Sequence, residues 1–152
     1  MRIYLDTSVI AVYLFGKHSE TEAGRLPPVK ELFDLINAHK VSATISLYTV
    51  QEIYSFCRRT FGPEDAGHIS RISLAELFTN DFELAGLLTR EERLLHRVRF
   101  AIDDLSDQPH VISAYLSGCD AIVTYDRHFR KIKKVFAIYV PEEIIGILSP
   151  PG

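Results

Sequence analysis

Four acidic residues lie far apart along the chain, yet each stands at or near the predicted end of a strand or the start of a helix. They are Asp6, Glu52, Asp107 and Asp126. Carboxylates that are brought together repel one another unless a cation lies among them. Oxygen ligands suit Mg²⁺ or Mn²⁺, whereas zinc prefers His and Cys, and the six histidines show no paired ligand spacing. The pattern therefore indicates a site for a hard divalent cation, provided that the fold gathers the four acids.

The elements that must position these acids alternate between strand and helix. Runs rich in β-branched and aromatic residues predict strands over residues 2–5, 41–45, 121–124 and 137–140. Helical spacing predicts helices over 7–15, 29–39, about 49–61, about 107–118 and 142–148, and two or three helices but no strand over 64–100. The alternation predicts one α/β domain over residues 1–148, with a parallel sheet of about four to five strands flanked by helices, and a flexible tail over 149–152.

A parallel sheet of this kind would bring the four acids to one edge, because ligands bind beyond the carboxyl ends of its strands. Asp6 comes at the end of the first strand, and Thr124 and Asp126 come at the end of the third. The helix after the second strand starts at the same edge, with Glu52 in its first two turns. The helix before the third strand runs antiparallel to that strand, so its first residue, Asp107, also belongs there.

Each acid also has a purely structural interpretation. Asp6 could terminate a strand, and Asp126 could be a turn residue. Glu52 could close a capping box with Thr49, and Asp107 could be a helix N-cap. The convergence at one edge favours the functional interpretation, because the structural one must explain the four acids separately.

Other polar residues are weaker candidates. Asp120 precedes the third strand and is expected to be a turn residue at the opposite edge, and the acids at 103–104 are expected to lie at a solvated helix end. His110 shares a helix face with Asp107, but a packed or hydrogen-bonded core histidine is the favoured interpretation. Thr7 and Ser8 could position water or a metal-bound phosphate, or could cap the first helix.

Several segments resemble the PIN domain family, the metal-dependent nuclease fold of many VapC-like toxins. The matching segments are residues 3–9, Glu52-Ile53, Asp107 with His110-Val111 and Ala114, and residues 118–126 with Phe129. The family's acids would fall on Asp6, Glu52, Asp107 and Asp126, with Thr124 as the accompanying hydroxyl. Ile112 and Ser113 depart from the small-residue run common in the family, and residues 64–100 match poorly and are expected to set partner or substrate specificity.

The resemblance implies an endoribonuclease that uses Mg²⁺ or Mn²⁺ and serves as the toxin of a type II toxin–antitoxin pair. An antitoxin partner and a homodimer are implied in the same way. We expect Asp6 to anchor the ion, Asp107 and Asp126 to complete its ligands, and Glu52 to orient the attacking water. A housekeeping RNA-processing nuclease and a catalytically silent module that binds RNA or protein stay open as alternatives.

The formal net charge of −3 argues against a general binder of polyanions, but the location of the charges changes this conclusion. Leaving out the four acids assigned to one site changes the charge from −3 to +1. Nine of the 17 basic residues lie between positions 90 and 134. The candidates for RNA binding are Arg127, Arg130, Lys131, Lys133 and Lys134, with Tyr125 and Phe129 available for base stacking, although a solvated face explains the same run equally well.

Several classes of protein are disfavoured by what the sequence lacks. Ser8 stands where a dehalogenase-type phosphatase needs a second Asp, the acid and lysine pattern of a receiver domain is absent, and so are nucleotide-binding glycine loops. Cys57 and Cys119 are expected to be buried free thiols in a reducing cytosol. No apolar run approaches the length of a membrane helix, so we expect a cytoplasmic protein without a membrane partner.

Overall fold

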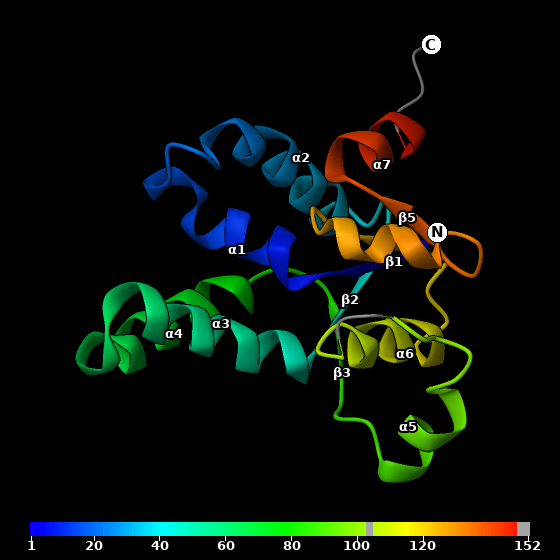
Figure 1. Ribbon diagram of the computed structural model, residues 1–152. Coiled ribbons are helices and arrows are strands. Elements are labelled where there is room, and N and C mark those ends of the chain that lie inside the picture. The colour runs from blue at the N-terminus through cyan, green and yellow to red at the C-terminus, as the bar shows by residue number, and fades with distance from the viewer. Residues whose placement is uncertain (103–104, 149–152) are drawn as a thin grey trace.

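The chain folds around a five-stranded parallel sheet in the order β3-β2-β1-β4-β5 (Figure 1). The computed structural model describes residues 1–102 and 105–148, so the predicted tail at 149–152 and the acids at 103–104 lie outside the described residues. The strands are β1 (Arg2–Leu5), β2 (Ser42–Ser46), β3 (Glu83–Ala85), β4 (Ala121–Val123) and β5 (Ala137–Tyr139). The predicted α/β class with a parallel sheet of four to five strands is confirmed.

Helices and short 3₁₀ segments cover the sheet and connect its strands. The α-helices are α1 (Thr7–Phe15), α2 (Leu26–Asn37), α3 (Leu47–Phe61), α4 (Pro63–Leu77), α5 (Arg90–His96), α6 (Gln108–Leu116) and α7 (Pro141–Leu148). The 3₁₀ segments are η1 (Gly16–His18), η2 (Ala23–Arg25) and η3 (Arg127–Ile132). Figure 1 shows α2 and α7 packed together on one side of the sheet and α6 on the other side.

The central strand β1 divides the apolar interior into two cores. Ile3 and Leu5 pack into the larger core with α1, α2, α3 and α7, whereas Tyr4 points to a smaller core with α6 and η3. All three side chains are fully buried, as expected for the middle strand of a parallel sheet that is covered on both faces. A polar group on Tyr4 must therefore find its hydrogen-bond partner inside the protein.

The predicted absence of a strand over 64–100 is wrong, because β3 pairs with β2 at the edge of the sheet. This strand has only three residues and Leu84 is exposed, so it lacks the alternation of buried and exposed residues that identifies a longer strand. Leu84 and Leu87 continued the helical spacing of the preceding segment instead. The predicted capping box at the start of α5 is confirmed, with Thr89 and Glu92 bonded reciprocally.

Several element boundaries also differ from the prediction. Helix α2 begins at Leu26 rather than at 29, because two prolines fit its first turn, where the missing N–H groups have no partner to lose. Helix α3 begins at Leu47 with Ser46 at its N-cap, so the predicted capping box between Thr49 and Glu52 is wrong. Thr49 is fully buried inside the helix, so Glu52 does not serve as the return arm of a capping box.

The two cysteines are free thiols, as predicted, but only Cys57 is fully buried. Cys119 is half-buried, and the desolvation of its thiol raises the pKa to about 11. Among residues 1–102 and 105–148, no helix combines the length and the apolar character that are needed to cross a membrane.

Candidate active site

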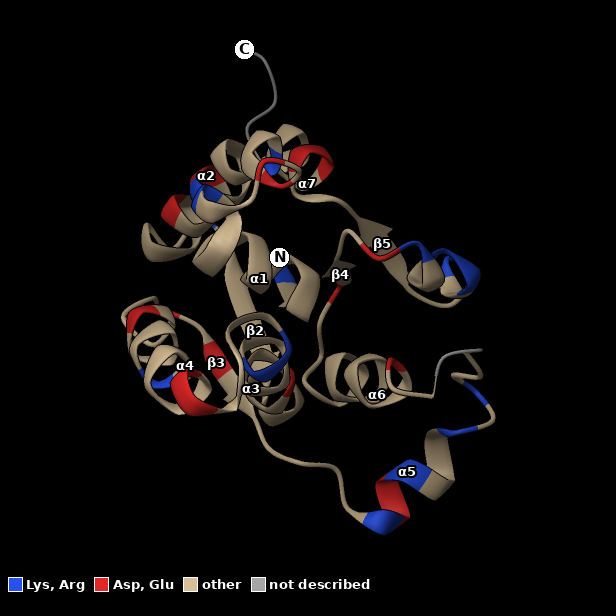
Figure 2. Cartoon of the chain, turned by 60° about the vertical axis from the view of Figure 1, so that its left-hand side comes forward, with Lys and Arg blue, Asp and Glu red and all other residues tan. Residues whose placement is uncertain are grey.

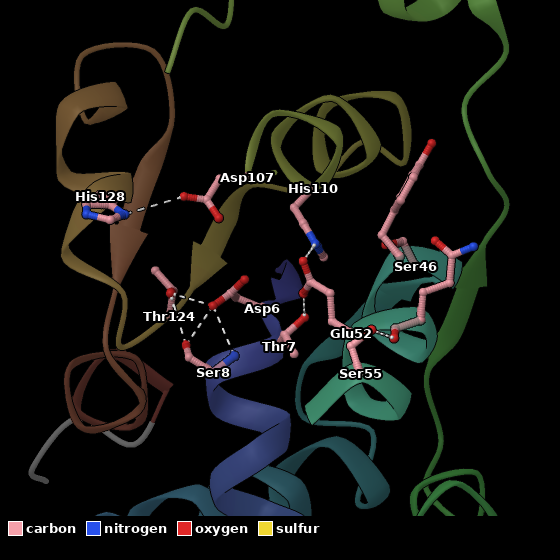
Figure 3. A network of polar contacts seen from close by, with 12 residues as sticks. Asp6, Thr7, Ser8, Ser46, Glu52, Ser55, Asp107, His110, Thr124 and His128 are labelled. Atoms are coloured by element: carbon pink, nitrogen blue, oxygen red, sulfur yellow. Dashed lines mark hydrogen bonds and ion pairs between the residues drawn. The ribbon is translucent and has the colours of Figure 1, made fainter. Parts of the chain in front are cut away.

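Asp6 stands where β1 passes into α1. Its backbone N–H donates to Val123 O at 3.1 Å, which continues the pairing of β1 with β4, and its side chain caps α1. Carboxylate atom Oδ2 accepts bonds from Ser8 N (3.1 Å), Ser8 Oγ (2.6 Å) and Thr124 Oγ1 (2.8 Å) (Figure 3). The hydrogen bonds that described residues donate to this buried side chain all end on Oδ2, so Oδ1 is left to accept from a further group.

Two hydroxyl groups lock the loop after β4 against the start of α1. Thr124 Oγ1, besides donating to Asp6, accepts from Asp126 N at 2.9 Å. Ser8 Oγ accepts from Tyr125 N at 3.0 Å. The hydroxyl of Thr124 thus joins the carboxylate of Asp6 to the backbone of Asp126, and it fixes the spacing between the ends of β1 and β4.

Asp107, Asp126 and His128 form a cluster in which one ligand atom from each residue lies within 4.8 Å of the others. His128 Nδ1 is 3.8 Å from Asp107 Oδ2 and 3.5 Å from Asp126 Oδ1. Asp126 also accepts from His128 N at 2.8 Å and thereby caps η3. Asp107 is buried at the N-cap of α6 and His128 is exposed, so the cluster lies at the boundary between the core and solvent.

Glu52 occupies the other side of this edge, outside that cluster. Thr7 Oγ1 donates to its Oε2, and His110 Nε2 lies 3.2 Å from its Oε1. The His110 ring is 1% exposed. The predicted interpretation of this residue as a hydrogen-bonded core histidine is confirmed, with Glu52 as one of its partners.

A chain of buried polar groups continues from His110 into the sheet. His110 Nδ1 lies 2.8 Å from the hydroxyl of Tyr4, which donates to Ser46 Oγ at 2.7 Å. With the Tyr4 proton directed to Ser46, both nitrogens of the His110 ring face acceptors. This arrangement favours the doubly protonated, positively charged ring.

The electrostatics of the two buried rings agree with this geometry. Burial by itself lowers the pKa of His110, but the hydrogen bond and charge of Glu52, with the charges of Asp6 and Asp107, outweigh burial and raise it above its ordinary value. Burial raises the pKa of Tyr4 far above its ordinary range, so this phenol stays protonated. The contact with Glu52 thus favours the protonated form of the His110 ring.

The structure gathers the predicted residues into two groups at the carboxyl edge of the sheet. Asp6 and Thr124 are bonded directly, Asp107 and Asp126 share the cluster with His128, and Glu52 lies beside Thr7, the residue after Asp6. Asp120 lies at the opposite edge, where it accepts from Arg2 N at 2.8 Å, as predicted. His128 was not among the predicted site residues, because it has no paired-histidine ligand spacing and its only sequence signal is its position two residues after Asp126.

The donor set fits a divalent cation. The cluster supplies two carboxylates and an imidazole, and Asp6 Oδ1 is a further candidate ligand atom outside that cluster. Carboxylate oxygens suit Mg²⁺ and Mn²⁺, and the imidazole favours Mn²⁺ over Mg²⁺.

The basic candidates for RNA binding lie in η3 and directly after it, where the blue positions gather beside β5 in Figure 2. Arg127, Arg130, Lys131, Lys133 and Lys134 are all exposed. Phe129 is fully buried in the smaller core, so the expectation that it stacks on a base is wrong. Tyr125 is half-buried, and Arg25 covers its ring at 4.4 Å from the centroid.

Comparisons with known proteins agree with this fold. The sequence pattern of the PIN domain matches residues 2–128. A comparison with curated protein sequences finds no match. The chain therefore belongs to the PIN domain family, and the predicted resemblance is confirmed.

Three solved structures with a similar fold are a VapC toxin and two VapBC complexes. VapC20 of Mycobacterium tuberculosis, described as a Sarcin-Ricin loop cleaving toxin, aligns with a TM-score of 0.63 and 15% identity over 89% of this chain and 96% of its own. DNA-bound VapBC from Salmonella typhimurium aligns with a TM-score of 0.59 and 19% identity, over 93% of this chain and 98% of its own. VapBC2 from Rickettsia felis, bound to a promoter DNA fragment, aligns with a TM-score of 0.55 and 16% identity, over 92% of this chain and 98% of its own. At these identities the likeness concerns the fold.

Proposed function

We propose that this protein is an endoribonuclease that depends on Mg²⁺ or Mn²⁺ and acts as the toxin of a type II toxin–antitoxin pair. The observation that supports it most directly is the cluster of Asp107, Asp126 and His128 beside the bonded Asp6 and Thr124. The VapC and VapBC neighbours support an RNA substrate and an antitoxin partner. A cytoplasmic homodimer is part of the same proposal.

In this proposal Asp6, Asp107, Asp126 and His128 hold the cation. A bound divalent cation lowers the pKa of water and neutralises the charge that develops on the phosphate oxygens. Thr124 holds the Asp6 carboxylate so that Oδ1 points away from its hydrogen bonds. The chain's own donors thereby orient one oxygen of Asp6 and leave the other for the cation.

Glu52 has a different role in this proposal, because protein groups already hold it. Thr7 and His110 fix the Glu52 carboxylate in place. From that position it accepts a hydrogen bond from the attacking water and orients a lone pair of the water oxygen toward phosphorus. As a new bond forms between that oxygen and phosphorus, the water passes the proton that faces Glu52 to this carboxylate, which later releases it to solvent. The bond from phosphorus to the leaving ribose oxygen breaks, and the leaving oxygen takes up a proton from solvent.

The test is isothermal titration of Mn²⁺ into the wild type, Asp126→Asn and His128→Asn, followed by cleavage of a mixed RNA pool. Loss of a ligand should weaken Mn²⁺ binding by at least about tenfold, since even outer-shell substitutions at metal sites cost 10–100-fold. We expect Asp126→Asn to abolish cleavage and His128→Asn to reduce it less, because an exposed side chain is a weaker anchor.

The matched control is Asp120→Asn, which removes the same charge at the opposite edge of the sheet. We expect it to bind Mn²⁺ as the wild type does. Equal Mn²⁺ affinity of Asp126→Asn and the wild type, or RNA cleavage that persists in EDTA, would refute the assignment. If the protein cleaves RNA but the product of an adjacent antitoxin gene does not inhibit this cleavage, the nuclease activity would stand and the role as a toxin would be rejected.

A further inference from the structure

A small basic pocket opens beside the candidate metal cluster. Its volume is about 180 Å³, and it lies between η3, the end of β5 and the start of α7. Arg127, Arg130 and Lys133 line it from the segment after β4, and Arg25 reaches it from η2. The five predicted RNA-binding residues between positions 127 and 134 form a basic tract, and two of them, Lys131 and Lys134, are not among the lining residues of the pocket.

The charges inside the pocket favour an anion. Arg127, Arg130 and Lys133 form no ion pair with an acid in the described part of the chain. Of the two acids that line the pocket, Glu143 accepts a bond from Val140 N at 2.9 Å, and Asp126 faces His128. Arg25, the fourth cation, is already paired with Glu22 at 2.9 Å. Three cationic side chains without an acidic partner among the described residues therefore line a space in which both acids already have partners.

The size of the pocket limits what can enter. Ordinary small-molecule sites measure about 300–1,000 Å³, so a space of about 180 Å³ suits a phosphate or sugar phosphate better than a larger ligand. Tyr139 and Ile138 form its less polar wall. A guanidinium forms paired hydrogen bonds to phosphate oxygens, which makes the arginines the natural ligands of such a group.

The pocket is continuous with the candidate active site. Thr124 and Asp126 line it. Thr124 is also bonded to Asp6, and Asp126 belongs to the candidate metal cluster. A ribonucleotide chain with one phosphate at the metal cluster would therefore pass directly over the pocket with the next part of its backbone.

We propose that this pocket is a subsite for the RNA phosphate next to the scissile one, held by Arg130, Lys133, Arg127 and Arg25. The inference rests on the proposed function and makes it more specific. It separates the basic tract into residues that bind one defined phosphate and neighbours, Lys131 and Lys134, that add only general positive charge.

The test measures binding of a fluorescent ten-nucleotide single-stranded RNA in EDTA, by anisotropy over a series of salt concentrations. One variant carries Arg130→Gln with Lys133→Gln, and the matched variant carries Lys131→Gln with Lys134→Gln. Both remove two positive charges from the same exposed segment. Circular dichroism and thermal unfolding establish that each variant is folded.

We expect the pocket variant to lose at least about tenfold in affinity and to lower the salt slope by about 0.7 for each lost phosphate contact. The matched variant should lose at most about twofold, as expected for general charge. Equal losses in the two variants would overturn the subsite, because the tract would then act as diffuse charge.

The result is distinguishable from a failure of the proposed function, because binding in EDTA needs no metal. A selective loss of RNA binding in the pocket variant, in a protein that cleaves no RNA with Mn²⁺, would retain the subsite and reject the nuclease. Metal-dependent cleavage with the same KM in both variants and the wild type would retain the nuclease and reject the subsite.

Discussion

The two halves of the carboxyl edge hold their acids in different ways. On the β1–β4 side, Asp107, Asp126 and His128 face one another, and Asp6 keeps one oxygen outside its hydrogen bonds. On the β1–β2 side, Glu52 is paired with His110, whose ring is anchored through Tyr4. Two carboxylates thus face each other on one side, whereas on the other side Glu52 lies against the imidazole of His110.

This difference shows that equal residue types at one edge need not share one role. A carboxylate that already has a buried cationic partner gains less from a metal ion than one that faces another acid. In the proposed function, the first half binds the metal ion and the second half orients the water. Variants that affect only one of these properties can separate the halves.

The largest effect should come from exchanging the acid in each half for its amide. We expect Glu52→Gln to reduce RNA cleavage by about 10²–10⁴-fold, the range for loss of a group that handles the proton of a reactant. It should leave Mn²⁺ affinity close to that of the wild type, whereas Asp126→Asn should lose Mn²⁺ binding. Isothermal titration and cleavage rates at saturating Mn²⁺ measure the two properties separately. If Glu52→Gln weakens Mn²⁺ binding as much as Asp126→Asn does, the two halves form one metal site.

A smaller effect is expected on stability when the buried chain behind Glu52 is interrupted. Tyr4→Phe removes a hydroxyl that contacts both His110 and Ser46 in a fully buried position. We expect it to lower the free energy of unfolding by about 1–3 kcal/mol, because a buried polar group is left without its partner. Urea unfolding measures the change.

The control for that variant is Tyr13→Phe, whose half-buried hydroxyl contacts Asn80 at 3.2–3.4 Å and whose ring stacks on Phe33. It should cost less than Tyr4→Phe, because water can replace the lost contact. Equal costs would mean that the chain from Tyr4 to Glu52 adds nothing beyond an ordinary hydrogen bond.

The smallest effect concerns the dependence of stability on pH. The pKa of His110 is raised in the folded protein, so protonation favours the folded state. This contribution is fully present below about pH 6.5, the ordinary value for an unfolded histidine, and is lost as pH rises through the higher folded pKa. The difference in unfolding free energy between the wild type and His110→Gln should therefore shrink from pH 6 to pH 9. A difference that is constant over this range would show that the ring does not pair with Glu52 in its charged form.

The sequence predicted the general plan of the site better than its detailed contacts. Asp6, Thr124 and Asp126 could be placed at one edge because parallel strands end there, and their positions depend only on short local segments. The partnership of Glu52 with His110 could not be predicted, because α3 and α6 are distant in sequence and come together only through the pairing of β2 and β4 with β1. The edge strand β3 was not predicted for a related reason, since three residues without a fully buried side chain become a strand only through pairing with β2.

By itself, the sequence determined the family, the parallel α/β plan and the set of acids at the carboxyl edge, because these depend on the order of strands and helices. Only the tertiary structure decided which acids face one another and which are paired with the protein. That division depends on how α6 and the loop after β4 pack against β1, and such contacts between distant segments leave no periodic signal in the sequence. The same packing brings Arg25 beside Arg130 and Lys133, and so decides which basic residues share a pocket.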